Sequence, residues 1–285
     1  MHNFQFINPK SLTEALQYLN QYGKEAKIIA GGTDLLVQLR NEDDKITGVK
    51  YLVYIDSLPK LKRIEIDKDY ILIGATVNHV EMASSEQIGA KSNFLSKAAS
   101  MIGSPQIRNR GTIGGNLVNA SPAADMAAPL LTLDAVIQIE SIREKRDVKL
   151  KDFFLGPGQT VLKENEIVIG IKFKKSDLEK SGTFIKMGQR NAMTIAIASI
   201  AVNLEVRQNI IIHIRVAAGS VAPTPIRLNA VEEFLENKEI NNKLLEEAMK
   251  KVSEEVCCIS DIRASAEYRR YVSGILFRHA FKKLT

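Results

Sequence analysis

Glycine and small residues fill one stretch of the chain, and this stretch constrains the fold more than any other. The segment RGTIGGNLVNASPAADMAAPLL, residues 110–131, contains three glycines and a single carboxylate. It is too polar to span a membrane and carries too few charges for an ordinary solvent-exposed face. Because glycine lacks a Cβ atom, its backbone adopts positive φ and lets a ligand approach closely. Residues 111–125 of this stretch therefore predict a loop with another group lying against its backbone.

A second glycine loop follows a short apolar run near the N-terminus. In AKIIAGGTDLL, Ile28 and Ile29 predict a buried strand that leads directly into Gly31 and Gly32. Successive N–H groups in such a turn can form a concavity that binds an anion. Either loop alone is also typical of a plain turn or a glycine-rich bend. Two of them in one domain favour an extended diphosphate ligand, whose charges require N–H groups around them.

The polar side chains of the longer loop suit a sugar–phosphate chain better than a metal. Asn116, Asn119 and Ser121 offer neutral hydrogen-bonding groups, and Asp125 offers an acceptor for ribose or ribityl hydroxyls. A metal would require several converging carboxylates or imidazoles. No HxxxH, HExxH or GxSxG spacing occurs in the chain. The reactive group is therefore expected to belong to a bound cofactor, with the protein supplying binding and orientation.

The histidines and cysteines exclude further kinds of site. Each of the four histidines is interpreted as structural or exposed rather than catalytic: His2, His79, His213 and His279. The only two cysteines, Cys257 and Cys258, are adjacent and cannot supply the four spaced thiolates of an iron–sulfur cluster or a structural zinc site. A disulfide framework is excluded as well. This cysteine usage predicts a protein of the reducing cytoplasm.

Length, charge and hydropathy set the remaining limits. A chain of 285 residues, 45% of them hydrophobic, predicts two domains rather than one. The net charge of +6 is compatible with a nucleic-acid binder or an enzyme, but Lys and Arg are spread along the chain. The N-terminal sequence has no signal-peptide pattern. The most apolar window, TIAIASIAVNLEV, is too short to span a bilayer.

Periodicity and turn signals predict the elements of the first half. Ser11 and Glu14 predict a capping box at the start of a helix that Gly23 ends. The expected strands lie at 26–30, 51–56, 62–67 and 70–75, with a turn at 67–69, and the expected helices at 78–84 and 92–101. No GxGxxG follows a strand, which argues against a Rossmann domain.

The second half divides at the polar segment KKSDLEKSG, where we expect a domain boundary near Asp177. A hairpin at 133–150 and a strand at 166–173 precede this segment. Beyond it, three strands in antiparallel succession are expected at 182–190, 195–206 and 209–220, followed by helices at 229–236, 242–256 and 264–283.

Three segments together resemble one known family. IIAGGTDLL, QIRNRGTIGGNLVNASPAADMAAPLL and SDIRASAEYRRYVSGILFRHAF are similar to the FAD-binding (medium) subunit of the molybdenum hydroxylases, such as bacterial xanthine dehydrogenase and aerobic carbon monoxide dehydrogenase. The resemblance covers the whole chain. It implies an α+β, vanillyl-alcohol-oxidase-like (PCMH-type) FAD-binding fold in residues 1–176, with subdomains of about 1–57 and 58–176. Residues 177–285 would form a CO dehydrogenase flavoprotein C-terminal-like domain with a three-stranded antiparallel sheet and helices.

The same resemblance assigns cofactor-binding residues. Those expected around the pyrophosphate are Ala30, Gly31, Gly32, Thr33, Asp34 and Leu35 on one side, and Thr112, Gly114, Gly115 and Asn116 on the other. Those expected at the remaining parts of FAD are Asn119, Ser121 and Asp125 for hydroxyl groups, Ile167 and Val168 for adenine, and Met101, Ile102 and Lys186 for the isoalloxazine. No catalytic residue and no metal ligand is assigned.

Departures from the family pattern refine these expectations. Relatives that link the flavin covalently have a histidine where this chain has Thr33, so FAD is expected to bind noncovalently. The cysteine count excludes the inserted iron–sulfur cluster of some members. An acidic residue that helps to position NAD in the family has no counterpart in QRNAMTI, residues 189–195. The electron acceptor therefore stays open between NAD and another molecule.

The implied function is electron transfer within a larger enzyme of the xanthine dehydrogenase type. A molybdopterin-binding large subunit would hydroxylate the substrate, and a small subunit with [2Fe–2S] clusters would pass electrons to FAD on this chain. A dimer of heterotrimers is the expected assembly. One alternative is a self-contained flavin reductase of the same fold, similar to the one that acts on UDP-N-acetylenolpyruvoylglucosamine. Another is a basic nucleic-acid-binding module without flavin.

Overall fold

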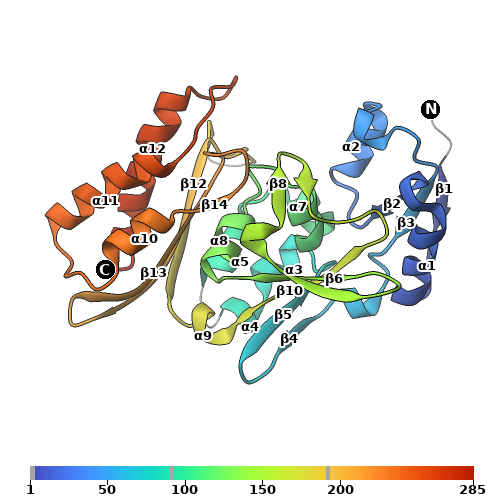
Figure 1. Cartoon of the computed structure of the whole chain (residues 1–285), viewed down its shortest axis with the longest axis horizontal. Coiled ribbons are helices and arrows are strands. Elements are labelled where there is room, and N and C mark those ends of the chain that lie inside the picture. Colours follow the sequence, from blue (N-terminus) through green and yellow to red (C-terminus); the bar gives the residue numbers. More distant parts are fainter. Residues whose placement is uncertain (1–3, 90–92, 191–192) are drawn as a thin grey trace.

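The computed structural model describes residues 4–89, 93–190 and 193–285. His2, Ser92 and part of QRNAMTI lie outside the described residues. The described chain forms three parts in a row (Figure 1), with the N-terminal subdomain at one end and the C-terminal domain at the other. Single 3₁₀ turns occupy Gly23–Glu25, Asp44–Ile46, Pro59–Leu61 and Leu150–Asp152. No helix in the described ranges has the length and apolar character needed to cross a membrane.

The N-terminal subdomain is a small parallel sheet covered by a helix. Its elements are β1 (Gln5–Ile7), α1 (Leu12–Tyr22), β2 (Ala26–Ile29), α2 (Leu35–Arg40) and β3 (Tyr51–Tyr54). The strand order is β1-β3-β2, and helix α1 contributes Leu16 and Leu19 to the core of this subdomain.

The predicted capping box of α1 is only half formed. The Ser11 hydroxyl accepts the Glu14 amide at 3.1 Å, as expected. The Glu14 carboxylate, however, accepts the amide of Lys10 at 2.6 Å rather than that of Ser11. The helix ends at Gly23 with φ of 50°, a conformation that glycine adopts without strain.

The second subdomain is built on a five-stranded antiparallel sheet. Its strands are β4 (Ile64–Ile66), β5 (Tyr70–Gly74), β6 (Val136–Glu140), β7 (Lys145–Lys149) and β10 (Ile167–Lys174), in the order β4-β5-β10-β6-β7. Both predicted hairpins are confirmed. In the first, the Asp67 carboxylate accepts the amides of Asp69 and Tyr70 and closes the turn. A separate small hairpin pairs β8 (Phe154–Gly156) with β9 (Gln159–Thr160).

The second subdomain also contains short helices. All of them in the described residues are α3 (His79–Ser84), α4 (Glu86–Gly89), α5 (Asn93–Ser100), α6 (Pro105–Arg110), α7 (Ile113–Val118), α8 (Ala127–Thr132) and α9 (Lys175–Leu178). The sequence patterns predicted α3 and α5 but not the others. The loop expected at 111–125 therefore contains one short helix, α7, and α8 follows it. The expectation was wrong for residues 113–118 because the small side chains there allow close packing, which periodicity does not register: Ile113, Gly114 and Leu117 of α7 are buried.

The C-terminal domain is an antiparallel sheet with helices on one face. The three predicted strands are confirmed as β11 (Ser181–Met187), β12 (Ala198–Arg207) and β13 (Ile210–Gly219). A fourth strand of two residues, β14 (Ile226–Arg227), extends the expected three-stranded sheet. The predicted helices are α10 (Asn229–Leu235), α11 (Asn242–Glu255) and α12 (Ala266–Lys282), and they pack beside this sheet (Figure 1).

Strand β12 is buried on both faces, which explains its nearly continuous apolar sequence. Ile200, Val202 and Leu204 point into the core shared with α10, α11 and α12. Ala201 belongs instead to the core of the second subdomain, together with Phe184 of β11 and Ala217 of β13. The C-terminal sheet therefore packs on one hydrophobic core with each face. This shared packing fixes the position of the two domains relative to each other.

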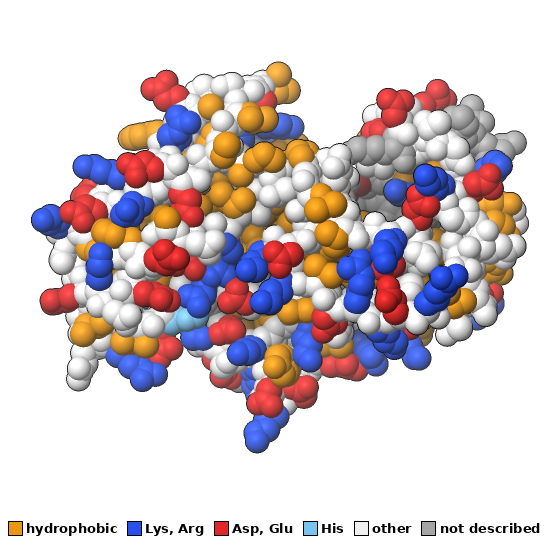
Figure 2. Space-filling view, in the orientation of Figure 1, with side chains coloured by type: hydrophobic (Ala, Val, Ile, Leu, Met, Phe, Trp, Pro, Cys, Tyr) orange, Lys and Arg blue, Asp and Glu red, His pale blue; other side chains and the backbone are white. Residues whose placement is uncertain are grey.

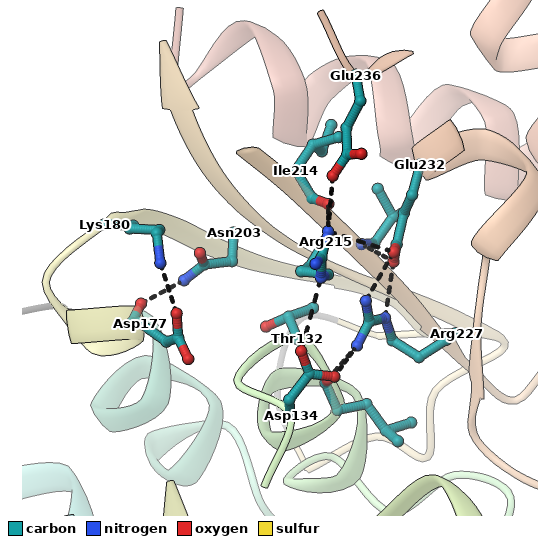
Figure 3. Close-up of polar contacts among 12 residues, drawn as sticks. Thr132, Asp134, Asp177, Lys180, Asn203, Ile214, Arg215, Arg227, Glu232 and Glu236 are labelled. Atoms are coloured by element: carbon teal, nitrogen blue, oxygen red, sulfur yellow. Dashed lines mark hydrogen bonds and ion pairs between the residues drawn. The ribbon is translucent and has the colours of Figure 1, made fainter. Parts of the chain in front are cut away.

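An ionic network with a buried Arg227–Glu232 pair reinforces this contact between the domains (Figure 3). Arg227 of β14 pairs with Glu232 of α10 at 2.6 Å and also with Asp134, just beyond α8. The side chains of Arg227 and Glu232 are only 9% and 7% exposed. Arg215 of β13 joins the same group through Asp134 at 3.6 Å and also pairs with Glu236 at 2.9 Å.

Candidate functional site

A deep cleft of about 830 Å³ separates the two N-terminal subdomains. One wall is the segment between β2 and α2, and the other is formed by α7 with the end of α6. The notch between these parts is visible along the upper edge of the molecule in Figure 2. Cofactor sites are typically concave and few in each protein, so a cleft of this size is the default candidate.

Most residues assigned by the sequence line this cleft. They are Ala30, Gly31, Gly32, Thr33, Asp34, Leu35, Ile102, Thr112, Gly114, Gly115, Asn116, Asn119, Ile167 and Val168. Ser121, Asp125 and Lys186 are not part of the lining. The Ser121 hydroxyl instead accepts the Ala123 amide at 3.2 Å and stabilises a turn.

The two glycine segments meet at Gly31. A Cβ atom on Gly31 would lie 1.8 Å from the carbonyl oxygen of Arg110, so no other residue fits there without moving the backbone. Gly32 has φ of 74°, a left-handed conformation that favours glycine. Across the junction, the Asn119 side-chain amide donates to the Asp34 carboxylate at 3.0 Å. The tertiary structure thus brings together the two segments that the sequence singled out.

The first segment offers free backbone donors to the cleft. The amides of Gly31, Gly32 and Thr33 donate to no backbone carbonyl in the described chain, whereas the next turn closes from Leu36 to Gly32 at 3.0 Å. Consecutive unpaired N–H groups carry partial positive charge and attract phosphate oxygens. This segment therefore fits an anionic ligand without requiring a charged side chain.

The glycine amides of the second segment, residues 112–116, are already hydrogen-bonded within the protein, so this segment contributes to the cleft mainly through close packing. The Gly114 amide donates to the Ala75 carbonyl at 2.9 Å, and the Gly115 amide donates to the Thr112 hydroxyl at 3.1 Å. A Cβ atom on Gly114 would lie 2.6 Å from the Ala75 oxygen, so this glycine lets α7 pack against the end of β5. Gly115 is exposed toward the cleft. Both glycines border the cleft, but only Gly115 is exposed, whereas Gly114 is buried against Ala75.

A buried ion pair supports the apolar residues at the adenine end assigned by the sequence. Ile167 and Val168 begin β10 and are almost fully buried. Just before them, Glu166 accepts two hydrogen bonds from Arg146, at 2.8 and 2.7 Å, and one from the Lys163 amide. Burial alone would raise the pKa of Glu166, but these donors outweigh it and lower that pKa. The Glu166 carboxylate therefore has a structural role, because its oxygens are already occupied by these hydrogen bonds.

Asp125 and Lys186 form a buried ion pair outside the cleft lining. The Lys186 Nζ donates to the Asp125 carboxylate at 2.6 Å, to the Met101 carbonyl at 2.8 Å and to the Thr194 carbonyl at 3.3 Å. All three ammonium protons are thus used. Burial raises the pKa of Asp125 to about 6 against the opposing effect of Lys186. This pair ties β11 to the residue preceding Ile102, which lines the cleft.

His79 was not assigned by sequence reasoning, yet it lines the cleft. The side chain is 2% exposed, and its Nδ1 atom has no hydrogen-bond partner. Burial and the nearby Arg108 guanidinium lower its pKa to about 4, so the ring is neutral at pH 7. The sequence signals only its place in a helix: Asn78 and Glu81 form a reciprocal capping box, which fixes His79 in the first turn of α3.

The described residues contain no group of three or more His, Cys, Asp or Glu that could hold a metal ion. Cys257 is exposed and Cys258 is partly buried, beyond α11 and away from the cleft lining.

Comparison with known proteins places this geometry in a family. Residues 2–173 match the model described as the FAD binding domain in molybdopterin dehydrogenase, and residues 183–284 match the CO dehydrogenase flavoprotein C-terminal domain. The chain is 33% identical to the glyceraldehyde dehydrogenase medium chain of Sulfolobus acidocaldarius, covering 99% of this chain and 98% of that one. It is also 33% identical to the xanthine dehydrogenase FAD-binding subunit of Escherichia coli, covering 92% and 89%.

A solved structure shows the same fold. One chain of carbon monoxide dehydrogenase from Hydrogenophaga pseudoflava superposes with a TM-score of 0.93 at 30% identity, covering 99% of this chain and 97% of that one. The expected α+β fold with its C-terminal sheet and helices is confirmed. The chain therefore belongs to the FAD-binding medium subunits of the molybdopterin dehydrogenase family, and it is an oxidoreductase flavin subunit of that family.

Proposed function

We propose that this chain binds FAD noncovalently in the cleft between its N-terminal subdomains and relays electrons within a molybdenum hydroxylase complex. The observation that carries the proposal is the junction at Gly31, where free amides of one segment face the cleft beside the second glycine segment. An unpaired, buried Oδ1 of Asn116 on the opposite wall supports the fit to a polar ligand. Thr33 has no nucleophilic nitrogen to link a flavin.

The proposed roles follow the walls of the cleft. The amides of residues 31–33 would bind the diphosphate, and Asn116 and Asn119 would contact hydroxyl groups. Ile167 and Val168 would lie at adenine, with Ile102 near the isoalloxazine. Ser121, Asp125 and Lys186 would act from behind by fixing the surrounding backbone. When bound, FAD supplies the capacity to take up and release electrons, and the protein supplies binding and orientation.

We propose a molybdopterin-binding large subunit and a [2Fe–2S] small subunit as partners, in a dimer of heterotrimers. The named relatives support this assembly, because each is called a medium chain or an FAD-binding subunit. The organic substrate would react on the large subunit, with NAD or another molecule as final acceptor. The xanthine dehydrogenase type is the specific class proposed, supported by 33% identity to the Escherichia coli subunit.

A self-contained reductase would need an acid–base pair beside the flavin. In the cleft lining, Glu166 is paired with Arg146, Asp34 accepts a hydrogen bond from Asn119, and His79 is neutral with a lowered pKa. The C-terminal domain also matches the CO dehydrogenase flavoprotein model. Both observations favour electron relay over a complete reaction on this chain.

Reconstitution with FAD tests the proposal. The full chain, stripped of cofactor and mixed with FAD, is expected to show flavin absorbance that remains after gel filtration. Asp125→Ala should weaken FAD retention about tenfold or more, because it leaves the buried Lys186 ammonium without its counter-ion. Asp147→Ala, on the exposed side of β7, is the matched control and should bind FAD like the parent. A parent chain that acquires no flavin would refute the proposal.

A further inference from the structure

The imidazole of His79 lies where the two glycine segments meet. A Cβ atom on Gly111 would be 3.2 Å from His79 Cδ2 and 3.5 Å from Nε2, so the ring packs directly on that glycine. The Cα of the same Gly111 lies 3.1 Å from the Cβ position of Gly31. His79 is thus separated from the amide-rich segment by one residue, and it belongs to the cleft lining.

The two ring nitrogens of His79 have different surroundings. Nδ1 is enclosed and has no hydrogen-bond partner in the structure. Nε2 makes no hydrogen bond to a described residue and is not among the enclosed, unpartnered atoms, which leaves it open to the cleft. Because an enclosed N–H without an acceptor is rarer than an enclosed acceptor without a donor, the favoured tautomer carries its proton on Nε2.

We propose that His79 is a further cofactor-binding residue whose Nε2–H donates a hydrogen bond to the diphosphate of FAD. This inference rests on the proposed function and adds one side chain to it. The position of the ring on Gly111 favours the diphosphate over the isoalloxazine, since Gly31, the first residue of the segment with free amides, lies against the same glycine. A neutral donor suits a site whose other donors are uncharged amides.

Nuclear magnetic resonance of the full chain with ¹⁵N-labelled histidine tests the contact directly. Adenosine diphosphate, which carries the diphosphate without the flavin, is expected to shift the His79 Nε2 resonance upon binding. Riboflavin, which carries the flavin without a phosphate, is expected to leave it in place. A bound diphosphate that leaves the His79 resonance unchanged, or a shift caused by riboflavin alone, would overturn the inference.

Two substitutions separate the donor from the shape of the ring. His79→Phe keeps an aromatic ring but no donor, and should weaken adenosine diphosphate binding about tenfold, the effect of one hydrogen bond to a charged group. His79→Gln retains an N–H donor and should stay within about threefold of the parent. His213→Phe, on β13 of the other domain, is the matched control and should not change the affinity.

The outcomes distinguish this inference from the proposed function. If the parent binds FAD and His79→Phe binds adenosine diphosphate equally well, His79 has no such role while the function stands. If neither FAD nor adenosine diphosphate binds the parent, both fail. Should His79→Phe not fold, the resonance shift in the parent still decides the question.

Discussion

At the scale of single residues, burial determines what the titratable groups around the cleft can do. His79 is almost fully buried, and burial keeps it neutral. Asp125 is buried beside the Lys186 ammonium group, which also donates hydrogen bonds to two backbone carbonyls. Neither residue is free to exchange protons with a substrate in the way that a general acid or base must. Their chemistry therefore supports binding and positioning, which is what an electron-relaying subunit requires of its protein part.

The neutral state of His79 should make the stability of the cofactor-free chain depend on pH. Its pKa is lowered from 6.5 to about 4 by burial and by Arg108, so the unfolded chain binds the proton more readily. The contribution of neutral His79 to the free energy of unfolding is fully present above pH 6.5. It decreases by an amount on the order of 3 kcal/mol as the pH falls toward 4. Urea unfolding of the parent and of His79→Gln between these pH values measures it.

The variant should show a shallower loss of stability than the parent over the same interval. Part of the loss will persist, because burial also lowers the pKa of His213. Equal slopes for the parent and the variant would show that His79 is already charged or exposed in the folded chain.

At the scale of elements, the site depends on two short segments held in contact. The turn after β2 and the C-terminal end of α6 approach each other only because Gly31 has no side chain. The hydrogen bond from Asn119, at the end of α7, to Asp34 links the two segments further along. The helices on either side are too short to be stable alone, so packing against the sheet positions them. The cleft is thus a product of contacts between elements rather than of any one motif.

Gly31→Ala should separate the two segments and abolish FAD retention. The added methyl group would overlap the Arg110 carbonyl oxygen, and relief of this overlap requires a backbone shift that costs about 1–3 kcal/mol. Gly89→Ala, at the end of α4, meets only an ordinary contact of 3.7 Å and is the matched control. Flavin absorbance after gel filtration, together with thermal unfolding, reports both effects. Normal FAD binding by Gly31→Ala would contradict the close approach.

At the scale of the whole molecule, the C-terminal sheet joins two cores, and ionic contacts hold its edge to the second subdomain. Arg227 reaches from β14 to Asp134 and to the Leu131 carbonyl, while it stays paired with Glu232 (Figure 3). At the opposite edge of the sheet, Lys186 of β11 reaches Asp125 and Met101. Ionic contacts therefore connect the two domains at two places, Arg227–Asp134 and Lys186–Asp125. The second of these lies beside the cleft.

Arg227→Met should destabilise the chain by about 3–5 kcal/mol, because it leaves the buried Glu232 carboxylate without its main partner. The double variant Arg227→Met/Glu232→Gln removes both charges but keeps an acceptor for the Val216 amide, so it should recover part of this loss. Arg207→Met breaks an exposed pair and should cost less than about 1 kcal/mol. Denaturant unfolding of the three variants gives these differences, and a double variant no more stable than Arg227→Met would argue against a buried ion pair.

The sequence determined local features whose cause lies within a few residues. Turn and capping residues such as Asp67 and Asn78 satisfy backbone groups three residues away or closer, so their structures were predictable. Runs of apolar residues predicted the long strands of the C-terminal sheet, and the paired glycine segments predicted two parts of the cleft lining. The glycines carried this information because only a residue without a side chain fits where two backbones meet.

Only the tertiary structure decided the features that depend on partners far apart in the chain. Lys186 and Asp125 are 61 positions apart, and no local pattern shows that they neutralise each other behind the cleft. The same holds for Gly114, which packs on Ala75, and for His79, whose solitary position in the sequence gave no sign of the cleft. Burial and charge pairing are set by which segments the fold brings into contact, and local sequence constrains those contacts only weakly.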